Sequence, residues 1–189
     1  MAIETERRFL IKPEDFFNLV PLPDKIDNIK QGYLSDDPER TIRVRIVNNR
    51  DAFITIKGKK VEGAGAEFEY RIPVDDALQM MEMSKAVLIK DRGYIPYDST
   101  SGLMWEIDYF MLDNRGLIIA EIELDDINFN LELPDWIGEE ITDDTRYANS
   151  NLANYPYSKW KELLPRGSIQ TFPREDLDRI KRYSRESGH

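Results

Sequence analysis

Hydrophobic and polar residues alternate along much of this chain in short segments. The segments are rich in β-branched and aromatic residues and end at turn signals such as Asn48-Asn49, Gly63-Ala64-Gly65 and Asp113-Asn114-Arg115-Gly116. Alternation with a period of two is typical of a β-strand that buries one face. We therefore predict strands over residues 2–10, 29–35, 41–47, 52–58, 66–72, 87–95, 104–110 and 117–124.

Eight strands with short links predict an antiparallel meander that closes on itself as an eight-stranded β-barrel, in the mainly β (α+β) class. Few segments have a helical period. A first helix is predicted at Pro13, because proline suits the first turn and Glu14 and Asp15 favour the positive helix end. Two more are predicted over residues 75–83 and from Pro173 to about Ser187.

The 189 residues suit one domain, which we place at 1–160, followed by a helical extension at 161–189. The extension differs in charge balance, since it carries Arg166, Arg174, Arg179, Lys181, Arg182 and Arg185. We expect this basic helix to dock on the acidic body or on the partner subunit of a homodimer. A lid over the barrel mouth is the alternative.

The residue types that the chain lacks exclude several kinds of catalytic and metal-binding site. The chain has no cysteine, which excludes disulfides, thiolate metal sites and cysteine nucleophiles and fits a reducing compartment. Its one histidine, His189, is the last residue, and chain ends are usually mobile. Acids, bases and metal ligands must therefore come from carboxylates, lysine, tyrosine or water, which favours hard cations.

Overall composition points to a globular cytoplasmic protein. Apolar residues make up 41% and charged residues 33% of the chain, and no long apolar run could span a membrane. The first six residues include two glutamates, unlike a signal peptide. A net charge of −10 opposes non-specific binding to nucleic acid, so none is expected, although a small polyanion could still bind at a local basic cluster.

Charge is concentrated on one face of the predicted strands. Residues i and i+2 of a strand share a face, and the polar positions of these strands are nearly all fully charged, with few serine, threonine or glutamine residues among them. Like charges occur as the i,i+2 pairs Glu4/Glu6, Arg43/Arg45, Glu67/Glu69, Lys90/Arg92, Glu106/Asp108 and Glu121/Glu123. Like charges side by side cost energy unless something of opposite sign binds there.

Two arrangements fit this pattern. A half-exposed sheet would turn its charged face to water. A closed sheet with the charged face inward would instead hold eight carboxylates and seven cations in a wet interior. Carboxylates without histidine or cysteine select Mg²⁺ or Mn²⁺, and arginine and lysine select phosphate oxygens. The second arrangement therefore predicts a site for a metal-bound polyphosphate.

The ordered series of motifs resembles the CYTH superfamily, also called triphosphate tunnel metalloenzymes, over roughly residues 1–155. The family's N-terminal E-x-E-x-K motif corresponds to Glu4-Thr5-Glu6-Arg7-Arg8, with arginine in place of the usual lysine. Arginine keeps the charge but is not equivalent to a compact ammonium. Further matches are Gln31-Gly32-Tyr33-Leu34, Arg43-Val44-Arg45, Thr55-Ile56-Lys57, Glu67-Phe68-Glu69, Lys90-Asp91-Arg92, Glu106-Ile107-Asp108, Glu121-Ile122-Glu123 and residues 134–152, similar to short bacterial members.

The resemblance implies an eight-stranded antiparallel tunnel that binds a triphosphate and a divalent metal. On this basis we assign phosphate binding to Arg8, Arg43, Arg45, Lys57, Arg71, Lys90, Arg92 and Arg146. Metal binding is assigned to Glu4, Glu6, Asp108, Glu121 and Glu123, and a second metal or the attacking water to Glu69, Glu106 and Asp108. Tyr33 and Asn149 are expected to serve packing and chain turning instead.

Three functions remain open. The leading one is a metal-dependent triphosphatase acting on inorganic tripolyphosphate or nucleoside triphosphates, with no covalent protein nucleophile. The second is an adenylyl cyclase on the same scaffold, which forms cyclic AMP and pyrophosphate. The third is a non-catalytic sensor of polyphosphate or nucleotides, which the intact carboxylate pairs disfavour.

Overall fold

The computed structural model describes residues 5–20, 23, 25–59, 66–126 and 129–165. Nine strands form one antiparallel sheet in the order β5-β4-β3-β2-β6-β7-β8-β1-β9. The strands are β1 (Thr5–Ile11), β2 (Ile26–Ser35), β3 (Arg40–Val47), β4 (Asp51–Gly58), β5 (Glu67–Ile72), β6 (Ala86–Pro96), β7 (Met104–Phe110), β8 (Ile118–Leu124) and β9 (Ile137–Glu140).

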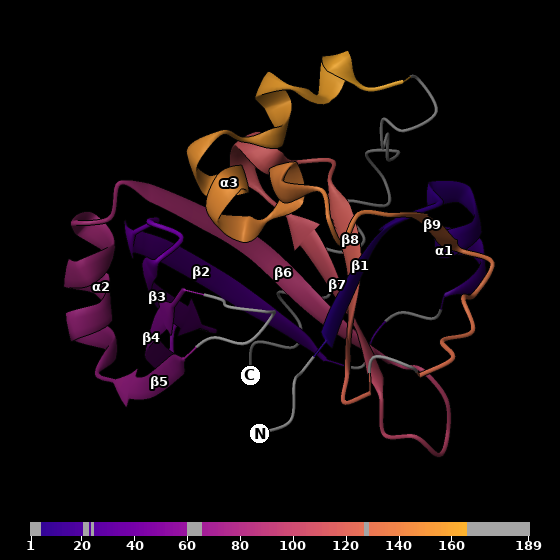
Figure 1. The fold of residues 1–189 in the computed structure, drawn as a ribbon, viewed down its shortest axis with the longest axis horizontal. Helices are drawn as coiled ribbons and strands as arrows, with labels where there is room; N and C mark the ends of the chain where they lie inside the picture. Colours follow the sequence, from indigo (N-terminus) through magenta and orange to yellow (C-terminus); the bar gives the residue numbers. More distant parts are fainter. Residues whose placement is uncertain (1–4, 21–22, 24, 60–65, 127–128, 166–189) are drawn as a thin grey trace.

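Short helices surround the sheet (Figure 1). They are α1 (Pro13–Leu19), α2 (Val74–Glu82) and α3 (Asn149–Asn154), with 3₁₀ turns η1 (Leu112–Asn114), η2 (Thr145–Tyr147), η3 (Tyr157–Lys159) and η4 (Lys161–Leu163). The predicted helix at Pro13 is confirmed, and the one predicted over 75–83 begins one residue earlier. The predicted helix from Pro173 to Ser187 lies outside the described residues. No helix in the described ranges has the length and apolar character needed to cross a bilayer.

The mainly β, antiparallel class is confirmed, and all eight predicted strands are present with ends shifted by at most a few residues. Two details of the described sheet add to this prediction. The sheet has a ninth strand, β9, which is too short to show alternation and forms by pairing with β1. In the described sheet β5 and β9 are the two end strands and no hydrogen-bonded pairing joins them, while β9 pairs with β1 only at Phe9 and Ile11.

The strand register gathers the charged residues on one face of the sheet, as predicted. Directly opposed residues of antiparallel strands share a face. In one half of the sheet, Arg43 lies opposite Thr55, which lies opposite Glu69. In the other half, Arg92 lies opposite Asp108, and Glu121 lies between its opposed residues Glu106 and Arg8. We call this side of the sheet the charged face.

Apolar side chains on the other face hold α1 and α2. Phe16 of α1 is buried against Trp136 and the apolar residues of β1, β7 and β8, while Ala77 of α2 packs with Val44 and Ile46. Both helices therefore lie outside the curled sheet (Figure 1), and the charged face lies on the inside of the curl. Burial of this apolar surface is the main favourable contribution to folding.

A third apolar cluster covers one end of the charged face. Leu88, Phe110 and Ile119 of the sheet pack with Leu152 of α3 and with Trp160. The C-terminal part of the described chain thus sits over β6, where Figure 1 draws α3 above the sheet. The charged region is closed by packed side chains at this end.

Candidate active site

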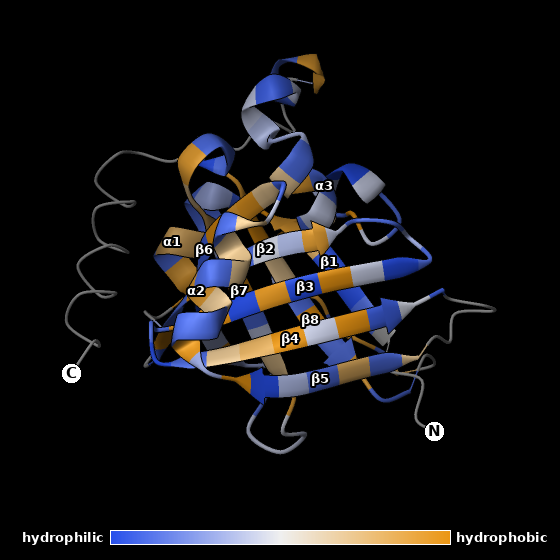
Figure 2. Cartoon of the chain, turned by 90° about the vertical axis from the view of Figure 1, so that its left-hand side faces the viewer, coloured by the Kyte–Doolittle hydropathy of each residue, from blue (hydrophilic) through white to orange (hydrophobic). Residues whose placement is uncertain are grey.

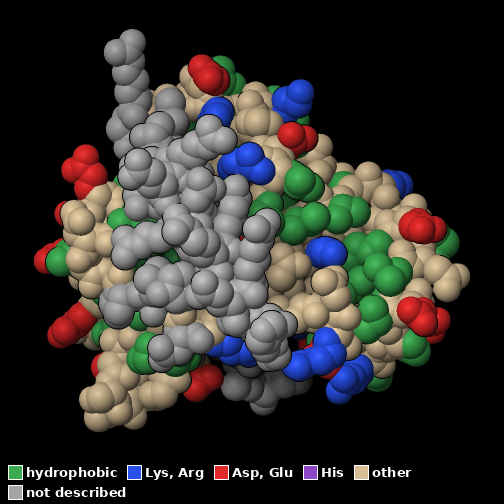
Figure 3. Space-filling view, turned by 180° about the vertical axis from the view of Figure 1, so that it is seen from behind, with side chains coloured by type: hydrophobic (Ala, Val, Ile, Leu, Met, Phe, Trp, Pro, Cys, Tyr) green, Lys and Arg blue, Asp and Glu red, His purple; other side chains and the backbone are tan. Residues whose placement is uncertain are grey.

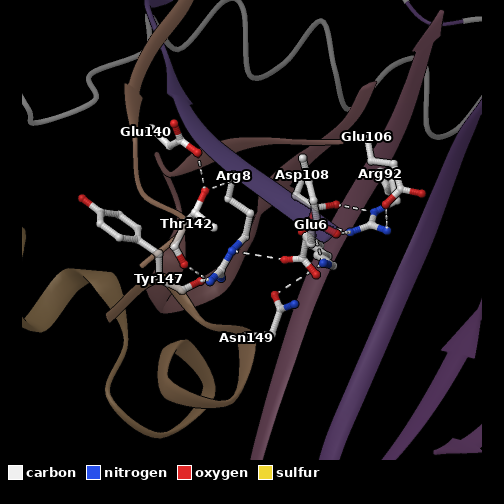
Figure 4. A network of polar contacts seen from close by, with 11 residues as sticks. Glu6, Arg8, Arg92, Glu106, Asp108, Glu140, Thr142, Tyr147 and Asn149 are labelled. Atoms are coloured by element: carbon white, nitrogen blue, oxygen red, sulfur yellow. Dashed lines mark hydrogen bonds and ion pairs between the residues drawn. The ribbon is translucent and has the colours of Figure 1, made fainter. Parts of the chain in front are cut away.

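The centre of the charged face is a buried cluster of ion pairs on β6 and β7 (Figure 4). The Asp108 carboxylate accepts from Lys90 Nζ at 2.5 Å and from Arg92 Nε and Nη2 at 2.6 and 2.8 Å. Arg92 also donates to Glu106. The side chains of Lys90 and Asp108 are only 3% and 2% exposed, so these charges depend on one another for solvation.

The pKa values in this cluster follow from burial and pairing. Burial alone would raise the pKa of Asp108, but the positive charges of Arg92 and Lys90 outweigh burial and lower it. Burial and then the neighbouring Arg92 lower the pKa of Lys90. Burial also lowers the pKa of Arg92, but the charge and hydrogen bond of Asp108 outweigh burial, so the pKa of Arg92 is raised. Asp108 therefore stays ionised as the shared partner of two cations.

Glu121, on the neighbouring strand β8, is buried with weaker compensation. The nearest cationic atom is Arg92 Nη2, 3.8 Å from Glu121 Oε1. Burial and the negative charge of Glu6 raise the pKa of Glu121 to about 8. A second positive charge at this point would favour the ionised form.

Arg8 on β1 joins the charged face to the segment that covers it. Its guanidinium lies 3.2 Å from Glu6 Oε1 and donates to the carbonyl oxygens of Thr142 at 3.0 Å and Tyr147 at 3.3 Å (Figure 4). The Arg8 backbone N–H donates to Thr142 Oγ1 at 3.1 Å. Asn149 at the start of α3 accepts from Lys90 Nζ at 3.4 Å.

A second polar cluster occupies β3, β4 and β5. Arg45 Nη2 donates to both Glu69 oxygens at 3.2 Å, and the buried Thr55 hydroxyl donates to Glu69 at 2.7 Å. Arg43 Nη2 donates to Thr55 Oγ1 at 3.3 Å. The Nε atoms of Arg43 and Arg45 are buried, and neither has a hydrogen-bond acceptor among the described residues. Such donors favour an added acceptor, such as a phosphate oxygen.

The remaining predicted residues lie nearer the margins. Lys57 pairs with Glu67 at 3.1 Å. Arg71, on the end strand β5, pairs with Asp51 of β4. Glu123 is exposed on β8 and lies opposite Glu6. Glu4 lies outside the described residues. The structure therefore does not bring Lys57 or Arg71 into either buried cluster.

Arg146 is also apart from both clusters. It pairs with Asp144 at 2.5 Å, and its guanidinium lies 5.2 Å from the centre of the Trp160 ring. Its assignment to phosphate binding came from the family resemblance alone, and no strand alternation supported it. Its observed contacts hold the covering segment together.

Sequence reasoning missed several neutral residues on the charged face. Thr55 lies two residues before Lys57, so the same alternation could have placed it with Glu69. Tyr33, expected to serve packing, is indeed buried, but its hydroxyl accepts from Gln31. Asn149 contacts Lys90 rather than only turning the chain, a contact that no local pattern could indicate because 59 residues separate the two.

Comparison with known proteins places this arrangement in a family. The family model described as CYTH domain matches residues 2–154. A protein from Acetivibrio thermocellus named inorganic triphosphatase is 38% identical over 164 residues, which cover 86% of this chain and all of that protein. An inorganic triphosphatase from Nitrosomonas europaea is 31% identical over 160 residues, which cover 79% of this chain and 96% of its own length.

Structural similarity agrees with these matches. The crystal structure of an inorganic triphosphatase has a TM-score of 0.58 to this chain at 27% identity, covering 81% of this chain and 95% of the other. The family match spans the whole charged face from β1 to α3. The chain therefore belongs to the CYTH family.

Proposed function

We propose that this chain is a metal-dependent triphosphatase that hydrolyses inorganic tripolyphosphate, nucleoside triphosphates or both. The observation that carries the proposal is one sheet face on which basic and acidic side chains from β1 and β3–β8 converge, with buried arginine donors that have no acceptor among the described residues. The names of the two relatives, which match over nearly their whole length, support inorganic triphosphate as the first substrate to test.

Two groups of cations are proposed to hold the substrate. Arg43 and Arg45 offer their buried Nε atoms on one side of the face. Lys90 and Arg92 lie on the other side, and Arg8 lies beyond them on β1. Phosphoryl transfer depends mainly on neutralising charge and aligning the attacking and leaving oxygens, which a basic lining on both sides provides.

The acidic residues fit a hard divalent cation, and we propose Mg²⁺ or Mn²⁺. Only oxygen donors are available, and the raised pKa of Glu121 beside Glu6 would be relieved by a cation between them. Glu4, Glu6, Glu121 and Glu123 would hold the ion. When bound, it would neutralise charge on the phosphate oxygens.

The described residues supply this site only in part. No three acidic side chains in the described ranges stand close enough to form a metal group by themselves, and Glu4 lies outside those ranges. The bound substrate's own oxygens are the other natural ligands of such an ion.

We propose that the carboxylates of Glu69, Glu106 and Asp108 orient the attacking water molecule. In this structure each is engaged by an arginine or by Lys90. A triphosphate would compete with them for those cations, because its oxygens carry more charge. The released carboxylates could then accept a hydrogen bond from water, and no side chain needs to form a covalent intermediate.

Product analysis tests this proposal. The full chain is incubated with Mg²⁺ or Mn²⁺ and either tripolyphosphate or ATP, and the expected product is orthophosphate. Cyclic AMP with pyrophosphate would instead identify a cyclase, and binding without turnover would identify a sensor.

Glu6→Gln provides the matching variant, with Glu82→Gln on the exposed side of α2 as its control. Removal of a metal-holding charge should lower the rate by about 100-fold or more, while the control keeps the wild-type rate. Equal rates for the two variants would remove Glu6 from the metal site.

A further inference from the structure

The end strand β5 has an exposed outer surface with aromatic side chains. Phe68 and Tyr70 are 52% and 59% exposed, and Ile56, opposite Phe68 on β4, is 38% exposed. Only one neighbour, β4, pairs with β5 in the described sheet. Figure 2 shows β5 as the lowest strand of its stack, below β4. Exposed edge strands of this kind pair readily with another strand.

The apolar surface continues beyond β5. Leu78 on the neighbouring helix α2 is 48% exposed. From behind, apolar side chains gather on the side of the molecule that holds α2 and the strands β3–β5 (Figure 3). This surface lies on the face of the sheet opposite the charged face, so the proposed triphosphate site does not account for it.

We propose that β5 pairs with β5 of a second copy of this chain, antiparallel, about a two-fold axis at Tyr70. This register places Tyr70 opposite the partner's Tyr70 and Phe68 opposite the partner's Ile72. On the charged side it places Glu69 opposite the partner's Arg71. The pairs formed by residues 68–72 are then either apolar or of opposite charge, which is the combination that stabilises a strand pair, and Glu67 falls opposite the partner's Pro73, just beyond the strand.

The charge pattern selects this register over its neighbours. An axis at Glu69 would oppose Glu69 to the partner's Glu69, and an axis at Phe68 would oppose Glu67 to the partner's Glu69. An axis between two residues would put charged side chains opposite aromatic ones. Self-complementarity of β5 therefore argues for a second copy of this chain as the occupant.

Sedimentation of the full chain tests the association. The wild type should form a dimer that dissociates on dilution. Tyr70→Lys removes the aromatic pair and sets two ammonium groups against each other, so the dimer dissociation constant should rise by at least about tenfold. Leu163→Lys, at an 81% exposed apolar residue on η4, should leave association unchanged.

A wild-type chain that is monomeric at high micromolar concentration would overturn the proposal. So would a Tyr70→Lys variant that dimerises as tightly as the wild type while keeping the wild-type circular dichroism spectrum.

Disulfide trapping tests the register, because the wild-type chain contains no cysteine. Tyr70→Cys should give a disulfide-linked dimer under mild oxidation, since position 70 opposes itself across the axis. Phe68→Cys should link poorly, because position 68 opposes position 72. Equal linking by both variants, or linking by Phe68→Cys alone, would contradict the register.

Discussion

Glu121 and Asp108 show how position decides the state of two buried carboxylates. Asp108 shares three short contacts with Lys90 and Arg92, whereas among the described residues the one ion pair of Glu121 is with Arg92 at 3.8 Å, and Glu121 faces Glu6. The sequence predicts that both residues line the charged face, because they sit at alternating strand positions. It could not predict which one is paired, since that depends on the strand register and on side-chain reach.

We expect Glu121 to make stability depend on pH. Its pKa is raised to about 8 in the folded chain, so the unfolded chain loses this proton first as the pH rises. The free energy of unfolding should therefore fall between about pH 4.5 and pH 8, and Glu121→Gln should remove that part of the slope. Urea unfolding at pH 5 and pH 8 in a chelator measures it.

Between pH 5 and pH 8, the free energy of unfolding should fall by at least about 1 kcal/mol more in the wild type than in Glu121→Gln, because one pKa unit corresponds to about 1.4 kcal/mol. Glu132→Gln, at an exposed residue, serves as the control. Parallel pH profiles for wild type and Glu121→Gln would show that the pKa of Glu121 is not raised.

Thr55 should matter for substrate binding rather than for turnover. Its hydroxyl links Glu69 to Arg43, so Thr55→Val keeps the shape but frees both groups from their common contact. We expect KM for tripolyphosphate to rise several-fold, on the order of 1 kcal/mol, because Arg43 loses the contact that positions it, with kcat nearly unchanged. Steady-state kinetics measures kcat and KM separately, with Thr100→Val, at an exposed threonine, as the control. A fall in kcat at constant KM would assign Thr55 to the chemical step instead.

Elements with a repeating pattern are predictable here, and elements made by distant contacts are not. Period-two alternation predicts β1 to β8, and Pro13 predicts the start of α1. In contrast, β9 has four residues and owes its form to β1, whose sequence lies over 120 residues away. The segment that covers Lys90 is likewise fixed by contacts with β6 and β1 rather than by its own propensity.

Helix α1 should contribute to stability through Phe16. This ring is 3% exposed and lies edge-on to Trp136, 5.4 Å between ring centres. Phe16→Ala should lower the free energy of unfolding by about 3–5 kcal/mol, because the cavity adds to the lost burial. Chemical denaturation measures the change, and Leu163→Ala should stay within about 0.5 kcal/mol of wild type. A Phe16→Ala loss as small as that of the control would mean that α1 is not docked.

At the scale of the whole molecule, closure was the part of the fold that could not be predicted. Eight alternating strands suggest a barrel, but the ring closes only if the end strands find each other. β1 takes β9 as its second neighbour, and β5 remains at the other end. The convergence of charge on one face did follow from sequence, because alternation fixes the face of every residue once the strands are in register.

A divalent cation should stabilise the whole chain. If Glu6 and Glu121 hold Mg²⁺ or Mn²⁺ only when folded, saturating metal raises the free energy of unfolding, by about 2.7 kcal/mol at 100 times Kd. Thermal unfolding with metal and then with excess chelator measures this. The combined Glu6→Gln and Glu121→Gln variant should lose the response, and a metal effect that survives in it would locate the ion elsewhere.

The three contacts of Arg8 have a mechanical consequence. Its guanidinium lies beside the Glu6 carboxylate and also donates hydrogen bonds to the carbonyl oxygens of Thr142 and Tyr147. The carbonyls are held by Nη1 and Nη2, whereas the buried Nε has no hydrogen-bond acceptor among the described residues, so we expect the same side chain to offer Nε to a substrate oxygen while it keeps the C-terminal cover in place. We expect the arginine at this position of the motif to hold the cover in a way that the family's usual lysine could not, because one compact ammonium on a flexible stem cannot reach both carbonyls and Glu6 with a fixed planar set of donors.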